Sequence, residues 1–312
     1  PAEGSAMGKI AFVFSGQGDQ FPGMGKDLYE KYPAAQKIYN LCDEIRPGTS
    51  AQCFHGTEEE LKETRNTQPC LFAMELAAAS VLMEKGITPD VVAGFSLGEV
   101  VAATVSGAFD NETGLRLVCK RGELMQSEAE KFDTSMAAVV KLTPEQVQKV
   151  CAKYSDVYPV NFNCPGQITV SGLTSQMTDF FVDVKAAGGR AIPLKVKGAF
   201  HSPFMKAAAE SFVEELKKAD IRERTITLYS NMTAEAYDDH IVDLLSLQIC
   251  SPVQWERLIR NMVSDGVDTF IEIGPGKTLT NMTKKISADV KAVNIMEYLA
   301  EVEGCQTEKQ RL

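Results

Sequence analysis

The sequence predicts an α/β fold in which a large domain with a parallel sheet carries a small inserted subdomain. Two short apolar segments, residues 9–14 and 90–94, are separated by one long apolar helix, and such alternation is typical of a parallel sheet. Between about residues 131 and 200 the order changes to β-α-β-β-α-β, the order of a ferredoxin-like unit. The 312 residues, 44% of them apolar, suffice for one large core with an insert.

The first predicted strand, Lys9–Phe14, runs into a glycine-rich loop at residues 15–25. The spacing of its glycines excludes a phosphate-binding loop. The third glycine of G-x-G-x-x-G would fall at Phe21, and Met24 stands where a P-loop requires lysine. We therefore expect this loop to present backbone N–H groups at the end of a strand.

The next element is a helix that we expect to start at Pro69 and to run to Glu84, with Gly86 and Pro89 behind it. Its residues are apolar around nearly the whole circumference, and a helix of that kind is buried. A parallel strand follows it.

That strand ends in Gly94-Phe-Ser-Leu-Gly98 and continues into a helix-forming segment, which is the strand-turn-helix setting of a nucleophile elbow. Glycines at the flanking positions let the backbones pack where a Cβ would clash, and Ser96 is the candidate nucleophile. The large domain is therefore expected to be α/β-hydrolase-like. A tight turn with a buried serine is the alternative, because G-x-S-x-G alone is weak evidence.

The insert is predicted from strands at residues 136–140, 157–161, 167–171 and 190–195 and from two helices, one beginning at Thr143 and one at Met177. We expect a ferredoxin-like subdomain at 131–200 and a large domain made of 8–130 and 201–297, followed by a C-terminal tail at 298–312. Residues 1–7 are expected to be an expression scar, residues 1–6, followed by the native start at Met7. The cleft between the two parts is the expected substrate site.

Composition excludes several classes of protein. The formal charge of −10 disfavours nucleic acid, because phosphate neutralisation needs a basic face. No segment approaches the roughly 20 apolar residues that cross a bilayer, so we expect a cytoplasmic protein that binds no membrane. The eight cysteines form no C-x-x-C pair, which argues against a metal site and against disulfides. For Cys164 alone, a reactive thiol near a pocket is an alternative to a buried one.

A serine nucleophile needs a positioned base, and the chain has three histidines. His55 and His240 lie near acidic residues and are expected at the surface. His201 follows the last strand of the insert, where the chain re-enters the large domain at the cleft, so it is the candidate base. A capping or core histidine is the alternative.

A tetrahedral intermediate needs two N–H donors for its oxyanion. Leu97 follows the nucleophile at a helix N-terminus, and Gly16-Gln17-Gly18 is the candidate source of the second donor. Arg121 lies in a helix with an otherwise apolar face, and its guanidinium would suit a free carboxylate on the acyl group. A solvated surface arginine is the alternative.

Six motifs that occur in order carry a family resemblance. They are Phe14-Ser-Gly-Gln-Gly-Asp-Gln-Phe-Pro-Gly-Met-Gly25, Thr67-Gln-Pro69, Gly94-Phe-Ser-Leu-Gly-Glu99, Lys120-Arg-Gly-Glu-Leu-Met125, Gly198-Ala-Phe-His-Ser-Pro203 and Gly274-Pro-Gly-Lys277. Together they resemble malonyl-CoA:acyl-carrier-protein transacylases of type II fatty-acid synthesis and the related acyltransferase domains of polyketide synthases. The resemblance spans Lys9 to about Met296.

The resemblance implies a role for each matching residue and requires neither a metal nor a cofactor. The implied roles are the acyl-enzyme at Ser96, the base at His201, the malonyl carboxylate site at Arg121, the oxyanion hole at Leu97 and Gln17, orientation of the histidine by the Gln248 carbonyl, and further pocket positions at Gln68 and Asn163.

Phe200, just before the candidate base, goes with malonyl selectivity in related acyltransferases, where serine goes with methylmalonyl. Its ring would fill the space that an α-methyl group needs. The chain departs from the family at Phe95, where many relatives have histidine, and in the Ser-Gly-Gln-Gly-Asp loop, where Pro-Gly-Gln-Gly-Ser is commoner. Neither departure removes a group that the mechanism needs.

The implied function is ping-pong transfer of a malonyl group from malonyl-CoA to the phosphopantetheine thiol of acyl carrier protein, by a monomer. Because carrier proteins are typically acidic, a basic rim around the cleft is expected, with candidates Lys195, Lys197, Lys277, Lys284 and Lys285. The alternatives are a stand-alone polyketide synthase acyltransferase, a thioesterase-type hydrolase and a non-catalytic carrier-protein scaffold.

Overall fold

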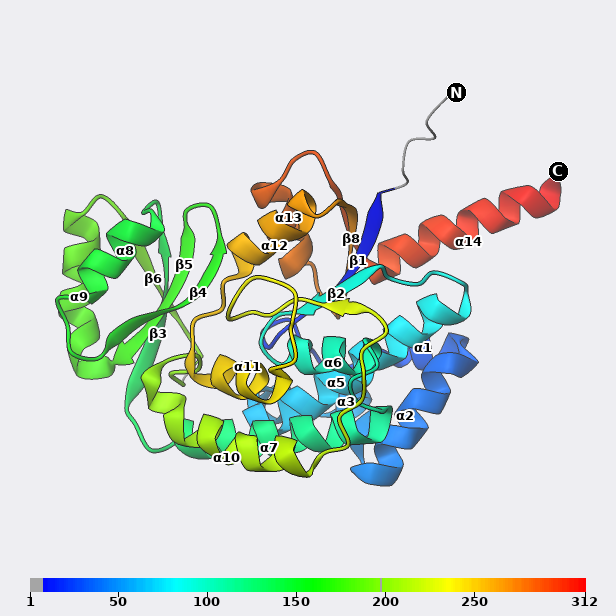
Figure 1. Ribbon diagram of the computed structural model, residues 1–312, viewed down its shortest axis with the longest axis horizontal. Helices are drawn as coiled ribbons and strands as arrows, with labels where there is room; N and C mark the ends of the chain where they lie inside the picture. Colours follow the sequence, from blue (N-terminus) through cyan, green and yellow to red (C-terminus); the bar gives the residue numbers. More distant parts are fainter. Residues whose placement is uncertain (1–7, 197) are drawn as a thin grey trace.

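The computed structural model describes residues 8–196 and 198–312 and is built around two sheets (Figure 1). Residues 1–7, with the expected start, and Lys197 of the expected basic rim lie outside the described residues. The larger sheet has five parallel strands in the order β7-β2-β1-β8-β9. These are β1 (Lys9–Phe14), β2 (Val91–Gly94), β7 (Thr227–Leu228), β8 (Val267–Ile273) and β9 (Lys291–Asn294).

Both faces of the parallel sheet are buried, which explains why its central strand is apolar without alternation. Phe12 and Phe14 of β1 lie in one hydrophobic core, and Ala11 and Val13 lie in a second core on the other face. The first core is covered by most of the helices and the second by α12 (Trp255–Ser264) and α13 (Thr278–Ile286).

The remaining elements of the large part are helices. They are α1 (Lys26–Lys31), α2 (Pro33–Ile45), α3 (Thr49–His55), α4 (Glu58–Lys62), α5 (Thr64–Glu84), α6 (Gly98–Val105), α7 (Asn111–Ala129), α10 (Lys206–Lys218), α11 (Ile241–Leu247) and the 3₁₀ turns η1 (Pro203–Met205) and η2 (Gln248–Cys250).

Helix α5 is buried along most of its length, as expected, but it does not start at Pro69. It begins at Thr64 and carries Pro69 in its second turn. The missing proline N–H forfeits one helical hydrogen bond, whereas the Glu63 carbonyl accepts from the N–H groups of Asn66 and Thr67, both at 2.8 Å. These bonds establish the helix one turn upstream of the proline.

The second sheet is antiparallel, in the order β4-β5-β3-β6, with α8 (Pro144–Cys151) and α9 (Thr174–Ala186) packed on it. Its strands are β3 (Thr134–Val140), β4 (Val157–Cys164), β5 (Gln167–Leu173) and β6 (Arg190–Leu194). This is the predicted β-α-β-β-α-β order, and Figure 1 shows it as a separate lobe beside the parallel sheet. A bridge between Asn161 and Val253 joins the two lobes.

The C-terminal residues form one helix, α14 (Ile295–Arg311), which projects from the body in Figure 1. The expected boundary between domain and tail at 297–298 falls inside this helix. The Asn294 side chain accepts from the Met296 N–H at 2.8 Å and so caps α14 at its start.

Candidate active site

The predicted elbow lies at the carboxyl end of β2, where parallel sheets place their ligand sites. Ser96 has a φ of 56°, a left-handed conformation that costs a non-glycine residue about 1–3 kcal/mol. A Cβ on Gly94 would stand 1.8 Å from the Gly98 carbonyl carbon, and a Cβ on Gly98 would stand 2.2 Å from the Phe14 oxygen. Both glycines are therefore needed for the turn to pass so close to its own helix and to β1.

Ser96 and His201 lie in hydrogen-bonding contact, although they are 105 positions apart in the sequence. Ser96 Oγ is 2.8 Å from His201 Nε2. His201 Nδ1 is 2.7 Å from the Gln248 carbonyl oxygen, which can only accept, so Nδ1 carries the proton and Nε2 is left to accept from the serine. The partner of Nδ1 is a backbone carbonyl, as the resemblance implied, and the arrangement is a dyad.

The histidine is held in its neutral form. It is 4% exposed, and burial, with the nearby Arg121 charge, lowers the pKa of His201 to about 4. A neutral imidazole is the form that can take a proton from serine. His55 and His240 are exposed, as expected, and His240 pairs with Asp238.

Arg121 is a fully buried cation beside the nucleophile, so the solvated alternative is wrong. Its Nη2 donates to the Gln248 Oε1 at 2.6 Å and lies 3.3 Å from Ser96 Oγ, and its Nη1 donates to the Gln68 Oε1 at 3.0 Å. Burial lowers the pKa of Arg121 to about 10, which leaves it charged at neutral pH. Among the described residues it has no carboxylate salt-bridge partner, and its Nε finds no hydrogen-bond acceptor.

The two expected oxyanion donors follow the carboxyl ends of two adjacent strands, β1 and β2. Leu97 is buried at the N-cap of α6, and Gln17 lies in the loop after β1. Within the described part of the chain neither backbone N–H is used in a hydrogen bond, while the Gln17 side chain donates to the Thr64 hydroxyl at 3.3 Å. A Cβ on Gly16 would stand 2.7 Å from the Phe95 carbonyl oxygen, so the loop and the elbow are in close contact.

Phe200 and Asn163, both expected to line the pocket, lie in different parts of the molecule. Phe200 is 9% exposed and belongs to the larger hydrophobic core, next to His201. Asn163 is buried in the antiparallel lobe, where its Nδ2 donates to the Thr169 hydroxyl at 3.1 Å. None of its hydrogen bonds within the described residues reaches Ser96 or His201.

Sequence reasoning missed two residues that support the elbow: Asn231, which bonds to it directly, and Glu99, which bonds to Asn231. Asn231 Oδ1 accepts from the Ser96 N–H at 2.8 Å, and the Glu99 carboxyl accepts from the Asn231 N–H at 2.5 Å. The available signal was the pair Ser230-Asn231, one residue beyond the end of a strand, because polar residues at the carboxyl end of a parallel strand often mark a site. The two-residue strand β7 gave too little pattern to show that position.

Other features of the predicted site are peripheral. Phe95 packs against Trp255, with 5.3 Å between ring centroids, and Cys164 is buried with its pKa raised, which disfavours a reactive thiol. Lys195, Lys284 and Lys285 are exposed, and Lys277 pairs with Glu297.

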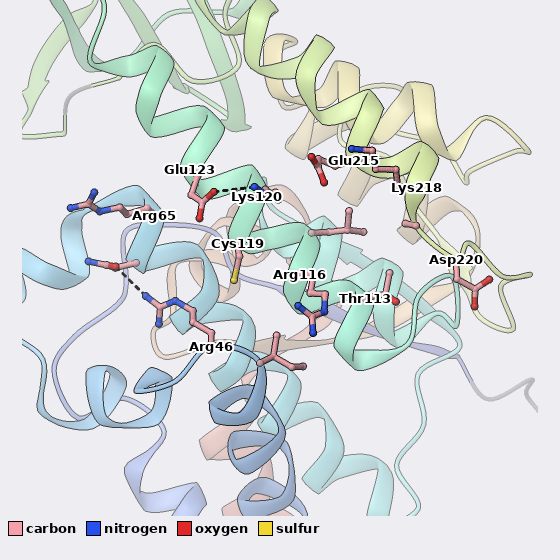
Figure 2. Close-up of a pocket in the computed structure, with 14 residues that line it drawn as sticks. Arg46, Arg65, Thr113, Arg116, Cys119, Lys120, Glu123, Glu215, Lys218 and Asp220 are labelled. Carbon is pink, nitrogen blue, oxygen red and sulfur yellow. Dashed lines mark hydrogen bonds and ion pairs between the residues drawn. The ribbon is translucent and has the colours of Figure 1, made fainter.

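A surface pocket of about 620 Å³ lies along another face of α7, lined among others by Arg46, Arg65, Arg116 and Lys120 (Figure 2). The catalytic candidates do not line it. In the described part of the chain no group of three or more His, Cys, Asp or Glu side chains could hold a metal ion, and no helix is long and apolar enough to cross a membrane.

Comparisons with known proteins place the chain in a family. Residues 11–305 match the family model described as the acyl transferase domain. The malonyl CoA-acyl carrier protein transacylase of Bacillus subtilis is 40% identical over 300 residues, which cover 93% of this chain and 94% of that protein.

Solved structures are similar to this chain over most of its length. The crystal structure of malonyl CoA-acyl carrier protein transacylase from Clostridium perfringens gives a TM-score of 0.91 at 35% identity and covers 97% of this chain and 99% of that chain. A structure of a type II PKS acyl-carrier protein in complex with its malonyl-transacylase gives 0.88 at 33% identity, covering 92% of this chain and 95% of that one. The predicted fold class is confirmed.

Proposed function

The chain belongs to the acyl transferase domain family, and from this premise we propose that it transfers a malonyl group from malonyl-CoA to the phosphopantetheine thiol of acyl carrier protein. The product, malonyl-acyl carrier protein, supplies fatty-acid synthesis. The observation that carries the proposal is the buried Arg121 guanidinium, which lies 3.3 Å from Ser96 Oγ and has no carboxylate partner among the described side chains.

An unpaired buried cation is costly, and a carboxylate that enters the site with the substrate supplies the missing anion. A malonyl group has such a carboxylate two bonds from its thioester carbonyl carbon, and an acetyl group does not. A thioesterase-type hydrolase of neutral acyl groups has no use for a cation at this position, so the arginine favours the transacylase.

The reaction proceeds in two matched half-reactions. His201 Nε2 takes the Ser96 proton as Oγ attacks the thioester carbonyl, and the N–H groups of Leu97 and Gln17 stabilise the oxyanion. The carbon–sulfur bond then breaks, and the imidazolium returns its proton to the sulfur of coenzyme A. The carrier-protein thiol repeats these steps on malonyl-Ser96, with His201 as its base, and regenerates the free serine.

The Gln248 and Gln68 side chains fix the guanidinium for this task. Each gives one amide oxygen to Arg121, so the cation is oriented before substrate arrives and its Nε stays available. Phe200 directly precedes the base in the chain, and in this proposal its ring limits the space beside the acyl carbon and favours malonyl over methylmalonyl. Asn163 stays a predicted pocket residue: its Nδ2 donates to the Thr169 hydroxyl, and its Oδ1 has no partner among the described residues.

The reaction needs no metal or cofactor in this scheme, and we place the enzyme in the cytoplasm as a monomer. The eight cysteines are all free thiols, which supports a reducing compartment. Light scattering of the purified protein tests the monomer, and a dimer would contradict it.

The test is the intact-protein mass after mixing with malonyl-CoA, methylmalonyl-CoA or acetyl-CoA, for the wild type and for Ser96→Ala. We expect a malonyl adduct that is absent in the variant and that passes to added acyl carrier protein. Free malonate without a carrier adduct would favour a hydrolase, and tight carrier binding without any adduct would favour a scaffold. The rates of transfer to a fatty-acid carrier protein and to a polyketide carrier protein distinguish the two pathways, and the similar type II PKS complex is the reason to test the second.

A further inference from the structure

We propose that Asn231 is a positioning residue for the nucleophile: its side-chain amide holds the two backbone flanks of the elbow, and a buried pair formed by Glu99 and Tyr237 holds Asn231. The inference rests on the proposed function, because it takes Ser96 as the residue that is acylated. It concerns the backbone of the elbow, which the Ser-His dyad alone does not fix.

The amide of Asn231 bridges the turn. Its Nδ2 donates to the Gly94 carbonyl oxygen at 2.5 Å, and its Oδ1 accepts from the Ser96 N–H at 2.8 Å. Only this orientation of the amide satisfies both, because one partner is an acceptor and the other a donor. The contact spans the residue whose φ is 56°, and such a conformation persists only where surrounding contacts determine it.

A second amide joins the same point. Gln248 Nε2 donates to the Ser96 carbonyl oxygen at 2.8 Å and lies 3.3 Å from Asn231 Oδ1. The Gln248 backbone carbonyl also holds His201, and its side-chain oxygen holds Arg121. The serine backbone, the base and the cation are therefore tied to one pair of amides, so a shift of the elbow changes the distance from Ser96 Oγ to His201 Nε2.

Asn231 is itself held by hydrogen bonds to other buried groups. It is fully buried, its N–H donates to Glu99 Oε1, and its carbonyl accepts from the Gln254 N–H at 2.8 Å. The Tyr237 hydroxyl donates to Glu99 Oε2 at 2.6 Å. The main-chain and side-chain polar atoms of Asn231 are thus bonded to protein groups, which leaves this residue to position Ser96 and not to contact substrate.

The experiment compares Asn231→Ala, Asn231→Asp and Asn294→Ala in the full chain. Asn294 is the matched control, because it is also a buried asparagine at a strand end and its Nδ2 donates to the Gly274 and Gly276 carbonyls. None of its side-chain hydrogen bonds within the described residues involves Ser96 or His201. The readouts are the rate of malonyl-Ser96 formation at saturating malonyl-CoA, the KM for malonyl-CoA, and thermal unfolding.

We expect Asn231→Ala to slow acylation by roughly 30- to 100-fold with KM changed less than about threefold, since displacement of a reacting group by about 1 Å costs on that order. Asn294→Ala should lose thermal stability but keep its acylation rate within about threefold. Equal rate losses in the two asparagine variants, or a wild-type rate in Asn231→Ala, would overturn the proposal.

The aspartate variant keeps the proposal testable if Asn231→Ala does not fold. A protonated aspartic acid can donate to the Gly94 carbonyl and accept from the Ser96 N–H, whereas a carboxylate faces that carbonyl without a proton. The acylation rate of Asn231→Asp should therefore rise toward the wild-type rate as pH falls, and a rate ratio that does not depend on pH would contradict the role. Absence of any malonyl adduct in the wild type would refute the proposed function instead.

Discussion

Two equally buried glutamates near the carboxyl edge of the parallel sheet differ in their surroundings. Glu99, under the elbow, is fully buried and both of its carboxyl oxygens accept hydrogen bonds, from Asn231 and Tyr237. Glu75, on α5, is also fully buried, but neither oxygen has a partner among the described residues, and nor does the hydroxyl of Ser15. Burial of a carboxyl group therefore serves different purposes in the two regions.

The pKa values reflect this difference. Burial raises the pKa of Glu99 to about 8, and the hydrogen bonds from Tyr237 and Asn231 oppose that rise. Burial raises the pKa of Glu75 well above its ordinary value, and the nearby Glu272 carboxyl raises it further. The neighbouring Ser15 hydroxyl lowers the pKa of Glu75 by less, and its oxygen makes no hydrogen bond to either carboxyl oxygen. The elbow side is a satisfied network that fixes a catalytic geometry, whereas Glu75 is a buried acid that the fold tolerates in its protonated form.

The largest expected effect is on the rate of acylation, and it is confined to residues at the elbow. Ser96→Ala should abolish acylation, and His201→Ala should reduce its rate by about 10³-fold, because the serine hydroxyl loses its base. Single-turnover mass spectrometry with malonyl-CoA measures both. Glu75→Leu is the control, with a rate expected within about twofold of the wild type, and a large loss of rate in that variant would break the comparison.

The next effect concerns the cation that faces the elbow network. Arg121→Gln should lower kcat/KM for malonyl-CoA by about 10²-fold, because a charged hydrogen-bonded contact to the malonyl carboxylate is lost. Since the Arg121 charge also lowers the pKa of His201, the midpoint at which acylation fails at low pH should move upward from about 4. The pH profile of malonyl-CoA turnover checks both effects.

Arg116→Gln is the matched control for this variant, because Arg116 is exposed on the same helix and pairs with Glu112. It should change neither kcat/KM nor the pH profile. Arg121→Gln with unaltered preference for malonyl-CoA over acetyl-CoA would remove the main support for a malonyl site.

The sequence predicted the elbow, the histidine that faces it, a parallel sheet in the large domain and the element order of the insert. These are marked locally, by glycines at fixed spacing, by a histidine after a strand and by runs of apolar residues. Asn231 left no such mark. Its contact with Ser96 spans 135 positions, and its strand is two residues long. Local pattern was also misleading at Pro69, because proline marks the first turn of many helices and here lies in the second. Pairings between distant segments become visible only when the strands are assembled.

Leucine substitutions at the two glutamates should change stability in opposite directions, and Glu99→Leu should have the larger effect. Leucine provides no acceptor, so the Asn231 N–H and the Tyr237 hydroxyl would remain buried without partners. Each such loss costs about 1–3 kcal/mol, so the free energy of unfolding should fall by roughly 2–6 kcal/mol. Urea unfolding at pH 7 measures it, and a variant as stable as the wild type would show that the network is dispensable for folding.

The smallest expected effect is at Glu75, and it depends on pH. The folded-state pKa of Glu75 is raised above its unfolded value of about 4.5, so above that pH the folded protein binds more protons than the unfolded chain. Stability from this group therefore falls as pH rises from about 4.5. Glu75→Leu removes that dependence and should raise the free energy of unfolding by about 1–3 kcal/mol at pH 8, with a smaller gain at pH 5. Urea unfolding of wild type and variant at both pH values measures this gain.

Two outcomes would contradict the prediction. An equal gain at pH 5 and pH 8 would mean that the Glu75 carboxyl has an ordinary pKa. A loss of stability at both pH values would mean that Glu75 has hydrogen-bond partners, which would end the contrast with Glu99.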